Sequence, residues 1–471
     1  MTQAEALAIL KTGANVFLTG EPGSGKTHTI NEYVAYLRSC GIEPAITAST
    51  GIAATHIGGL TIHSWSGIGI RRDLSAYDLD HITQNKNIVR RVENAHVLVI
   101  DEVSMLSSRT LDMIDVVCRE IRRSKEAFGG LQVILVGDFF QLPPVFARSE
   151  DDGQKTIEDS CPQSGEQFAY QSRAWEALNP LVCYLSEQHR QEDEIFLEFL
   201  SSVRRGRIEE HHRVLLRTRY SPVPRDGITQ LYSRNANVDE INNAELGKVP
   251  GTSNVFQMTS QGPEKLVAGL KRGCLSPETL MLKVGARVMF TKNDVTMHRY
   301  ANGTIGAVVD FAKDTGLPIV KTNAGKMILV ENDEWRIEDG GRVLARISQV
   351  PLRLAWAMTV HKSQGMSLDA AHMDLSDAFE YGQGYVALSR VRTLAGLSLA
   401  GLNARALEVH PAIRAKDVGF RGMSDDARET FARMPKKELE TMHVNFIRAC
   451  GGNTTKSSLA KQDKSKYKRK Y

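Results

Sequence analysis

The chain has 471 residues, a formal net charge of +4 and six cysteines. This length exceeds what one hydrophobic core can organise, so roughly two to four domains are expected. The weak charge balance does not by itself identify a nucleic-acid partner. The scattered cysteines form no Cys-x-x-Cys pair, and no apolar run approaches the ~20 residues that cross a bilayer. These features argue against a membrane protein, a zinc site and a disulfide framework, and they indicate a reduced cytosol.

The first predicted elements are a short strand, a glycine-rich loop and a helix. Residues 14–19 are apolar, as in a buried parallel strand, and apolar residues recur at helical spacing over residues 27–39. The loop between them, residues 20–27, reads Gly-Glu-Pro-Gly-Ser-Gly-Lys-Thr. Such a loop surrounds a β-phosphate with backbone N–H groups at a helix N-terminus, so it predicts nucleotide binding. Its closeness to Met1 leaves no room for a presequence, which favours a bacterial or phage-type cytoplasmic protein.

Each residue type in this loop has a separate role. Gly20, Gly23 and Gly25 give the backbone its freedom. Lys26 can reach the β- and γ-phosphates, and the Thr27 hydroxyl can ligate Mg²⁺. We therefore expect a nucleoside triphosphate and Mg²⁺ to bind here.

Residues 1–185 alternate between apolar strands and helical patterns. The runs at 45–48, 97–100 and 133–136 are each followed by a polar or glycine-bearing turn. This pattern predicts a doubly wound α/β domain with ligands at the carboxyl ends of its strands. Residues 66–95 interrupt the pattern as a small polar insertion, and residues 148–166 form an acidic, loop-like stretch.

A second α/β region begins near Leu185, and its character changes partway along. Residues 280–350 are rich in Val and Gly and form short alternating runs separated by turns, which predicts an inserted β barrel. The last residues are basic and poor in apolar side chains, as in a disordered tail. The predicted units are 1–185, 186–279 with 351–415, 280–350, a helical segment at 416–450, and a tail at 451–471.

Two further elements complete a hydrolytic site. Asp101 and Glu102 end the strand at 97–100. Asp101 can hold Mg²⁺ through water, and Glu102 can orient and deprotonate an attacking water. A transfer to a small acceptor would not need this base, so the pair favours hydrolysis. Gln141 follows the next buried strand, where its amide can sense the γ-phosphate.

Several segments together resemble a known family. Residues 19–27, 101–105 and 137–145 look like motifs I, II and III of superfamily 1 helicases. The run Phe128-Gly-Gly-Leu-Gln132 resembles the signature of the Pif (petite integration frequency) family of 5′→3′ DNA helicases, in superfamily 1B. Further matches follow in order at 50–54, 61–64, 185–191, 234–243, 359–365 and 385–390.

The resemblance implies two RecA-like domains with ATP between them. Residues 66–95 would be the small 1B wedge, flanked by Arg71, Arg72, Arg90 and Arg91, and the inserted barrel would be the SH3-like 2B element. It also implies an ATP-dependent, DNA-stimulated helicase that moves 5′→3′ on single-stranded DNA and unwinds forks, G-quadruplexes and RNA–DNA hybrids. The expected pathways are DNA repair, recombination and telomere-type maintenance. Alternatives are a RecD-like helicase and a translocase that remodels DNA without separating strands.

The family's nucleotide residues can be carried onto matching positions of this chain. ATP would contact Gly23, Ser24, Gly25, Lys26 and Thr27, with Gln3 reading the adenine and Gln364 and Gly365 approaching the γ-phosphate. Arg190 and Arg390 would be arginine fingers from the second domain. Since such fingers reach the γ-phosphate only when the cleft closes, they make hydrolysis depend on closure.

DNA would run across both domains through contacts mainly to its phosphates. The expected DNA-binding residues are Thr50, Gly51, Thr61, His63, Ser64, Pro143, Asn235, Thr359, His361 and Lys362. Trp65, Phe139, Phe140 and Pro143 are expected to offer faces to bases, with core packing as the alternative for Phe139 and Phe140. The expected state is a monomer in solution and a dimer on DNA, with single-strand-binding or repair proteins as partners.

Overall fold

The computed structural model describes eleven stretches of the chain, and every structural statement below concerns them alone. They are residues 1–56, 59–69, 71, 73–144, 168–186, 193–224, 228–233, 238–294, 297, 299–339 and 342–454. The acidic stretch predicted at 148–166 lies outside them, as does the predicted tail from residue 455 onward.

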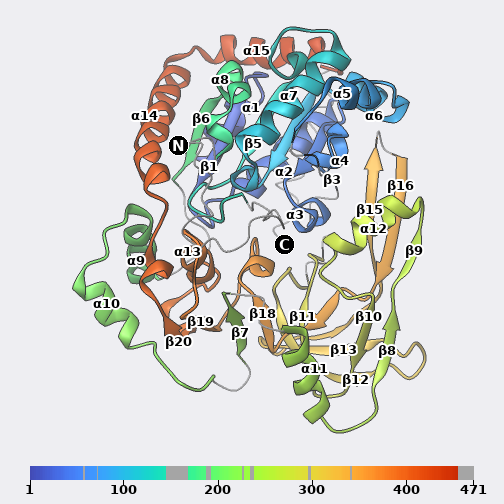
Figure 1. Ribbon diagram of the computed structural model, residues 1–471, viewed down its shortest axis with the longest axis vertical. Coiled ribbons are helices and arrows are strands. Elements are labelled where there is room, and N and C mark those ends of the chain that lie inside the picture. The colour runs from blue at the N-terminus through green and yellow to red at the C-terminus, as the bar shows by residue number, and fades with distance from the viewer. Residues whose placement is uncertain are drawn as a thin grey trace.

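A six-stranded parallel sheet organises the first part of the chain (Figure 1). Its spatial order is β3-β2-β4-β5-β1-β6, and every pairing is parallel. β1 and β5 are buried along their whole length, as central strands are when helices cover both faces. The strands are β1 (Val16–Gly20), β2 (Ala45–Ala48), β3 (Leu60–Thr61), β4 (Val97–Asp101), β5 (Gln132–Val136) and β6 (Leu181–Leu185).

Alternate residues of these strands face two separate cores. Phe17 and Leu98 pack with Trp65 and Leu111 on one face, while their neighbours pack on the other face with residues such as Tyr33. This arrangement confirms the predicted doubly wound domain. Its helices are α1 (Gln3–Leu10), α2 (Lys26–Ser39), α3 (Gly51–His56), α4 (Ile62–Ser66), α5 (Ala76–Thr83), α6 (Lys86–Asn94), α7 (Ser108–Arg122) and α8 (Arg173–Leu178). Short 3₁₀ turns are η1 (Val103–Met105), η2 (Ala127–Gly130) and η4 (Ala169–Gln171).

The predicted insertion at 66–95 contains the helices α5 and α6. Ser75 caps α5 by accepting from Asp78 N, and the two helices pack on each other and on α7. Two of the flanking arginines have partners here. Arg71 Nε lies 2.8 Å from Asp78 Oδ1, and Arg91 donates to the carbonyls of Ser64 and Trp65. Arg90 is exposed, and Arg72 lies outside the described residues.

A second, four-stranded parallel sheet has the order β18-β7-β19-β20. Its strands are β7 (Thr229–Tyr232), β18 (Ala357–Thr359), β19 (Ala371–Leu375) and β20 (Leu397–Leu402). The helices beside it are α9 (Glu194–Arg205), α10 (Glu210–Arg217), α11 (Val238–Lys248) and α13 (Gln383–Leu388), with 3₁₀ turns η5 (His361–Ser363), η6 (Leu394–Gly396) and η7 (Ala404–Leu407).

Antiparallel sheets interrupt this second region, as the alternating pattern at 280–350 predicts. One sheet has the order β14-β13-β12-β11-β17, a second pairs β10 with β8, and a third has the order β15-β16-β9. Antiparallel strands begin already at Asn254, because β8 and β9 pair with β10 and β16 farther along the chain. The strands are β8 (Asn254–Gln257), β9 (Thr259–Gln261), β10 (Thr279–Leu282), β11 (Arg287–Phe290), β12 (Ile305–Phe311), β13 (Pro318–Thr322), β14 (Met327–Leu329), β15 (Asp333–Asp339), β16 (Arg342–Gln349) and β17 (Leu352–Leu354). The helix α12 (Glu264–Gly273) accompanies them.

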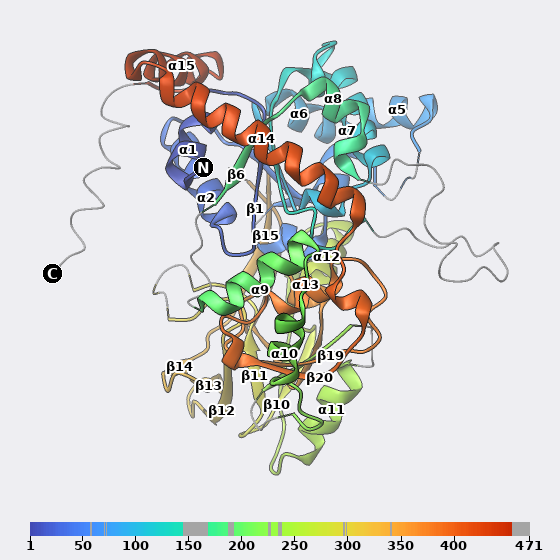
Figure 2. The ribbon, with the colours of Figure 1, turned by 90° about the vertical axis from the view of Figure 1, so that its left-hand side faces the viewer.

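The last two helices return from the second region to the first. α14 (Pro411–Arg433) runs along the molecule to α15 (Lys436–Ala449), as Figure 2 shows. The Ser424 hydroxyl of α14 accepts from Tyr184 N on β6, and His443 of α15 lies 2.9 Å from the Ala8 carbonyl. Ile447 joins the core of the first domain. The C-terminal helices therefore hold the first domain although they follow the second in sequence.

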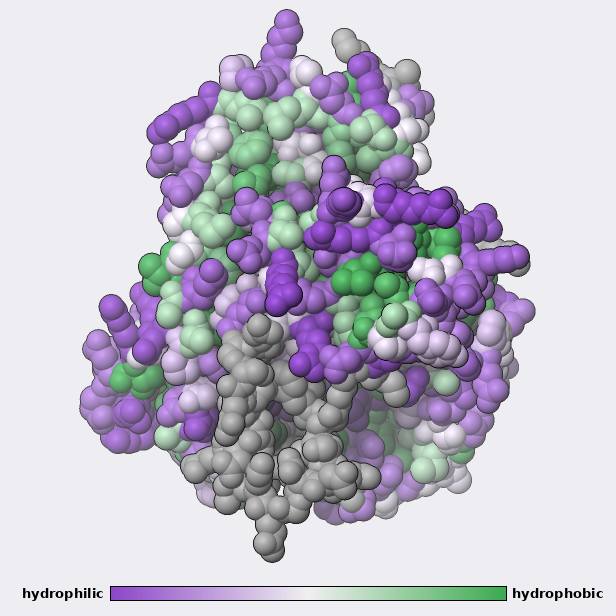
Figure 3. Space-filling view, turned by 45° about the horizontal axis from the view of Figure 1, so that its top comes forward, coloured by the Kyte–Doolittle hydropathy of each residue, from purple (hydrophilic) through white to green (hydrophobic). Residues whose placement is uncertain are grey.

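The molecular surface in one view is mostly hydrophilic. Figure 3 shows hydrophilic residues over much of one face, with smaller hydrophobic areas between them. Among the described residues, no helix combines the length and apolar character that spanning a bilayer requires.

Candidate functional site

The phosphate loop connects β1 to α2 and depends on its glycines. Gly23 and Gly25 both have φ of 88°, in the left-handed region that glycine tolerates best. A Cβ atom on Gly25 would displace the Gln3 amide, whose Nε2 would lie 2.0 Å away, and the φ of 88° would be strained for a residue with a side chain. Lys26 Nζ donates to the Gly20 carbonyl at 2.8 Å and to the Glu21 carbonyl at 3.2 Å. The lysine ammonium thus lies inside the loop, at the start of a helix.

Gln3 and Ser24 lie against each other at this loop. Gln3 begins α1, which Thr2 and Glu5 cap reciprocally, and its Nε2 donates to the Ser24 carbonyl at 3.2 Å. Ser24 Oγ is buried and has no hydrogen-bond partner among the described atoms. A nucleotide phosphate would supply the missing acceptor, so the residues present fit ATP.

The two predicted carboxylates meet at the carboxyl end of β4. Asp101 ends the strand, and its Oδ1 accepts from Glu102 N at 2.8 Å. Glu102 has a φ of 53°, a strained conformation for a residue with a side chain. Burial raises the pKa of Asp101, and burial followed by the Asp101 charge raises the pKa of Glu102. Oxygen ligands of this kind, with the Thr27 hydroxyl, suit Mg²⁺.

Gln364 joins both domains at the site. It follows the η5 turn after β18, and its Nε2 lies 3.2 Å from Glu102 Oε2 and 3.2 Å from Gln141 Oε1. Gln364 therefore connects the predicted base, Glu102, with the predicted γ-phosphate sensor, Gln141, through hydrogen bonds from one side chain.

Arg390 lies directly behind this group. It is 1% exposed and donates to the carbonyls of Val386 at 2.8 Å, Ser363 at 3.4 Å and Met366 at 3.3 Å. Its positive charge is close enough to lower the pKa of Glu102, although less than burial raises it. The structure thus brings a second-domain arginine to the back of the first-domain carboxylates.

A cavity of about 520 Å³ opens between the two domains. It is lined by predicted nucleotide residues, which are Thr27, Asp101, Glu102, Gln364 and Gly365. The same cavity reaches the predicted DNA residues Thr50 and His361. The nucleotide and DNA predictions therefore converge on one space.

The predicted DNA-contact residues of the first domain lie on β3, on α4 and at the start of α3, with Thr50 immediately before that helix. Thr61 caps α4 by accepting from Ser64 N, and Thr50 Oγ1 accepts from Ala53 N. Burial lowers the pKa of His63. A Cβ atom on Gly51 would lie 3.2 Å from the Gly273 Cα of α12, so this backbone closely approaches the second region.

The second-domain residues follow β18. Thr359 Oγ1 accepts from Lys362 N at 3.3 Å, and burial lowers the pKa of His361. Thr359 itself is buried. Asn235 and the predicted finger Arg190 lie outside the described residues, so their positions stay predictions.

Four further residues considered for base contacts are buried. They are Trp65, Phe139, Phe140 and Pro143. The Phe139 ring centroid lies 5.4 Å from that of Phe17 and 6.2 Å from that of Phe420. Core packing, the alternative that the sequence left open for Phe139 and Phe140, therefore holds for both. Trp65 and Pro143 likewise present no exposed face to a base.

The signature run at 128–132 has a structural role that the sequence did not indicate. Gln132 Oε1 accepts from the Tyr33 hydroxyl at 2.7 Å, and its Nε2 donates to the Leu10 and Ala14 carbonyls. Phe128 N donates to Asp115 Oδ1 at 2.6 Å. A cavity of about 830 Å³ lies beside this run, but its lining contains no residue of the phosphate loop. The signature run therefore connects α1, α2 and α7 at the amino end of β5.

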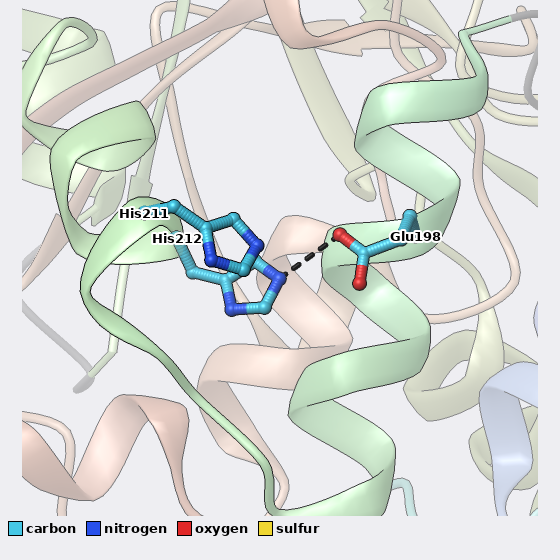
Figure 4. Close-up of side chains that lie close together, drawn as sticks. All are labelled: Glu198, His211 and His212. Carbon is cyan, nitrogen blue, oxygen red and sulfur yellow. Dashed lines mark hydrogen bonds and ion pairs between the residues drawn. The ribbon is translucent and has the colours of Figure 1, made fainter.

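One cluster has the composition of a metal site. Glu198 on α9 lies beside His211 and His212 on α10, as Figure 4 shows. However, His212 Nδ1 accepts from Glu209 N at 3.0 Å and Nε2 lies 2.9 Å from Glu198 Oε2. Both ring nitrogens of His212 are used by the protein, so His212 joins the two helices and has no free lone pair for a metal.

Comparisons with known proteins agree with this geometry. A family model described as a PIF1-like helicase matches residues 2–214. The ATP-dependent DNA helicase Pif1 of a Psychrobacter species is 40% identical over 529 residues, covering 100% of this chain and 78% of the relative. That of Bdellovibrio bacteriovorus is 36% identical, covering 87% of this chain and 90% of the relative.

Solved structures give the same result. Bacteroides Pif1 in complex with ADP-AlF4 has a TM-score of 0.76 and 28% identity, covering 89% of this chain and 96% of that one. The same protein bound to single-stranded DNA has a TM-score of 0.59 and 28% identity, covering 90% and 97%. A structure described as the basis for unwinding forked duplex DNA by two coordinating Pif1 helicases has a TM-score of 0.60 and 27% identity, covering 90% and 97%.

Proposed function

Given that this chain belongs to the PIF1-like helicase family and is an ATP-dependent DNA helicase, we propose that it translocates 5′→3′ on single-stranded DNA. Closure of two RecA-like domains around ATP and Mg²⁺ would drive this movement. The observation that carries this closure-driven mechanism is the Gln364 side chain, whose Nε2 lies 3.2 Å from Glu102 Oε2 and from Gln141 Oε1. Because Gln364 belongs to the second domain, closure of the cleft and the state of the γ-phosphate are mechanically linked.

Each nucleotide residue has a proposed role in this cycle. Lys26 would hold the β- and γ-phosphates, and Thr27 and Asp101 would hold Mg²⁺, which would supply neutralisation of the developing charge. Glu102 takes the proton of the attacking water, and its buried position beside Asp101 raises its pKa and hence its basicity. Arg390 and Arg190 stabilise the transition state from the second domain. Gln3 and Gly365 complete the nucleotide pocket.

Single-stranded DNA would lie along the tops of both domains. The proposed contacts are Thr50, Gly51, Thr61, His63, Ser64, Asn235, His361 and Lys362, whereas buried Thr359 positions Lys362 by accepting from its backbone N–H. The complex of Bacteroides Pif1 with single-stranded DNA supports this class of substrate. The structure with two coordinating Pif1 helicases supports forked DNA as a substrate and two copies acting on one fork.

Further parts of the proposal concern biology. We propose a monomer in solution, a location in the bacterial cytoplasm, and roles in DNA repair and recombination. G-quadruplexes and RNA–DNA hybrids are proposed as further substrates, and single-strand-binding or repair proteins as partners. The bacterial relatives support the bacterial setting.

The decisive experiment compares matched duplexes that differ only in the end that carries the single-stranded tail. We expect unwinding of the 5′-tailed duplex and none of the 3′-tailed duplex in the presence of ATP and Mg²⁺. Unwinding that requires a 3′ tail would reject the polarity. ATP hydrolysis stimulated by DNA without unwinding of either duplex would instead favour a remodelling translocase.

A further inference from the structure

A buried polar cluster lies where the two domains meet, and the nucleotide site does not include it. Arg204 ends the apolar face of α9, and its guanidinium is 2% exposed. Nη1 donates to both oxygens of Asp138, at 2.9 and 2.8 Å. Asp138 is fully buried and follows β5, so this ion pair connects the second region to the first domain.

The same guanidinium reaches the helix that leads to Arg390. Nη1 lies 3.2 Å from the Tyr385 hydroxyl, and Nη2 donates to the Tyr184 hydroxyl at 2.7 Å. Tyr385 is on α13, and Arg390 lies two residues beyond the end of this helix at Leu388. One side chain therefore touches the first domain through Asp138 and Tyr184, and the Arg390 segment through Tyr385.

Asp138 also shapes the turn that carries the predicted γ-phosphate sensor. Its Oδ1 accepts from Phe140 N at 3.1 Å, and its carbonyl accepts from Gln141 N at 3.0 Å. The Arg204 guanidinium carbon lies 4.0 Å from the centre of the Phe140 ring. Arg204 thus fixes both the backbone and a side chain of the turn that ends at Gln141.

A close backbone approach shows that the two domains touch at this turn. A Cβ atom on Gly382, the N-cap of α13, would lie 2.5 Å from the Phe140 carbonyl oxygen and 2.8 Å from that of Gln141. No side chain fits at this position. Small displacements of the Gln141 turn are therefore transmitted directly to α13 and onward to Arg390.

The cluster is not arranged for stability alone. Arg204 Nε is buried without a hydrogen-bond partner, and Asp417 Oδ1 of α14 lies 3.7 Å from Nη2. Replacing a buried ion pair by neutral groups is often neutral for stability, whereas removing one partner leaves an uncompensated charge. Because separating the pair would expose such a charge inside the protein, Arg204 and Asp138 are expected to remain together throughout the cycle.

We propose that Arg204 is a positioning residue for ATP hydrolysis, and that its ion pair with Asp138 is the pivot on which the cleft closes. The pivot fixes the Gln141 turn of the first domain against the Arg390 segment of the second. This inference rests on the proposed closure-driven cycle. It assigns Arg204 no contact with the nucleotide, so it predicts an effect on turnover and little effect on ATP binding.

The test compares Arg204→Met with the double variant Arg204→Met/Asp138→Asn. The double variant removes both charges and keeps the acceptor for Phe140 N. We expect Arg204→Met to lower the DNA-stimulated kcat by roughly 100-fold, with the KM for ATP nearly unchanged. The double variant should recover much of the melting temperature and keep the low kcat, while Arg204→Lys should be intermediate, because lysine cannot contact Asp138 and Tyr184 as a fork.

Arg119→Met is the matched control. Arg119 Nε lies 2.7 Å from Asp115 Oδ2 within α7, so this variant breaks an ion pair away from the domain boundary. It should lower the melting temperature without lowering kcat. If Arg204→Met and the double variant do not fold, Tyr385→Phe, which removes one hydroxyl from the cluster, should still lower kcat.

A normal kcat in the double variant would overturn the inference. If neither Arg204 variant folds, a normal kcat in Tyr385→Phe would overturn it instead. The proposed function fails separately, if the unaltered protein shows no hydrolysis stimulated by single-stranded DNA. The two failures are therefore distinguishable in one set of measurements.

Discussion

The Lys26 loop and the Arg390 segment hold their cations in different ways. Lys26 bonds to carbonyls only five and six residues away, so its position is built by one continuous stretch of chain. Arg390 donates to the carbonyls of Ser363 and Met366, which lie in the segment between β18 and β19 and flank Gln364. Under the proposed function, the first arrangement would bind the phosphates in any state of the cleft, whereas the second would act only when the domains meet. We therefore expect nucleotide binding and hydrolysis to be separable by mutation.

The largest effect is expected from the Lys26 loop itself. Lys26→Ala should remove measurable ATP hydrolysis and unwinding, because the ammonium that bonds to the Gly20 and Glu21 carbonyls of the loop is lost. Binding of labelled single-stranded DNA should persist, since the proposed DNA contacts lie elsewhere. Lys248→Ala, which alters an exposed ion pair on α11, is the matched control. Retained hydrolysis in Lys26→Ala would reject this site.

Arg390→Gln tests the other half of the comparison. It should lower kcat by about 10³-fold, as for removal of an arginine finger, and leave the affinity for a fluorescent ADP analogue almost unchanged. Steady-state kinetics and nucleotide titration on the same preparation separate the two quantities. Weakened nucleotide binding with normal turnover would show that Arg390 does not act on the transition state.

The pH dependence of turnover probes the buried carboxylates. Burial and the Asp101 charge raise the pKa of Glu102, so the carboxylate takes up a proton at a higher pH than an ordinary glutamate. A general base must be deprotonated, and DNA-stimulated kcat should therefore fall as pH decreases through this raised pKa. Single-strand binding over the same range serves as the control. A kcat that stays constant down to the ordinary glutamate range would contradict the assignment.

The Gln364 contact should have a smaller effect. Gln364→Ala removes hydrogen bonds to Glu102 and Gln141 but no charge, so we expect about a tenfold loss in DNA stimulation of hydrolysis. The rate without DNA should change less. An equal loss with and without DNA would mean that Gln364 serves the chemical step alone.

The smallest effect on catalysis is expected from a substitution of Gln132, at the amino end of β5. Gln132→Ala leaves the Tyr33 hydroxyl and two carbonyls without their partner, which should cost about 1–3 kcal/mol in the free energy of unfolding. Turnover well below the melting temperature should be nearly normal. Chemical denaturation alongside kinetics measures both, and a large loss of kcat at full stability would give the signature a direct role.

The sequence predicted those parts of the site that one segment builds. The loop at 20–27 and the carboxylates after β4 could be recognised because residue type and local spacing define them. The doubly wound sheet was predicted for the same reason, since its buried strands are short apolar runs between helical patterns. Burial of Phe139 could not be decided from the sequence, because Phe420, whose ring packs on it, belongs to α14 far along the chain.

Arg204 and Asp138 were missed because nothing local marks them. Arg204 follows Phe196, Phe199 and Val203 on the buried face of α9, and a charge at that position was the one available signal. Its partner lies 66 residues away, on another domain. The sequence also did not predict that antiparallel strands begin at Asn254. β8 and β9 pair only with strands farther along the chain, so no local pattern marks them.

The central claim is that the nucleotide closes the cleft between the two domains. Exposed Ala35 on α2 and exposed Ala244 on α11 can be replaced by cysteine and labelled with a dye pair, after substitution of reactive native cysteines. Energy transfer between the dyes then reports the distance between domains. We predict that ADP with aluminium fluoride and single-stranded DNA changes this distance in the unaltered site, and changes it much less in Arg390→Gln. An unchanged distance in the unaltered site, despite proven binding of both ligands, would contradict the account.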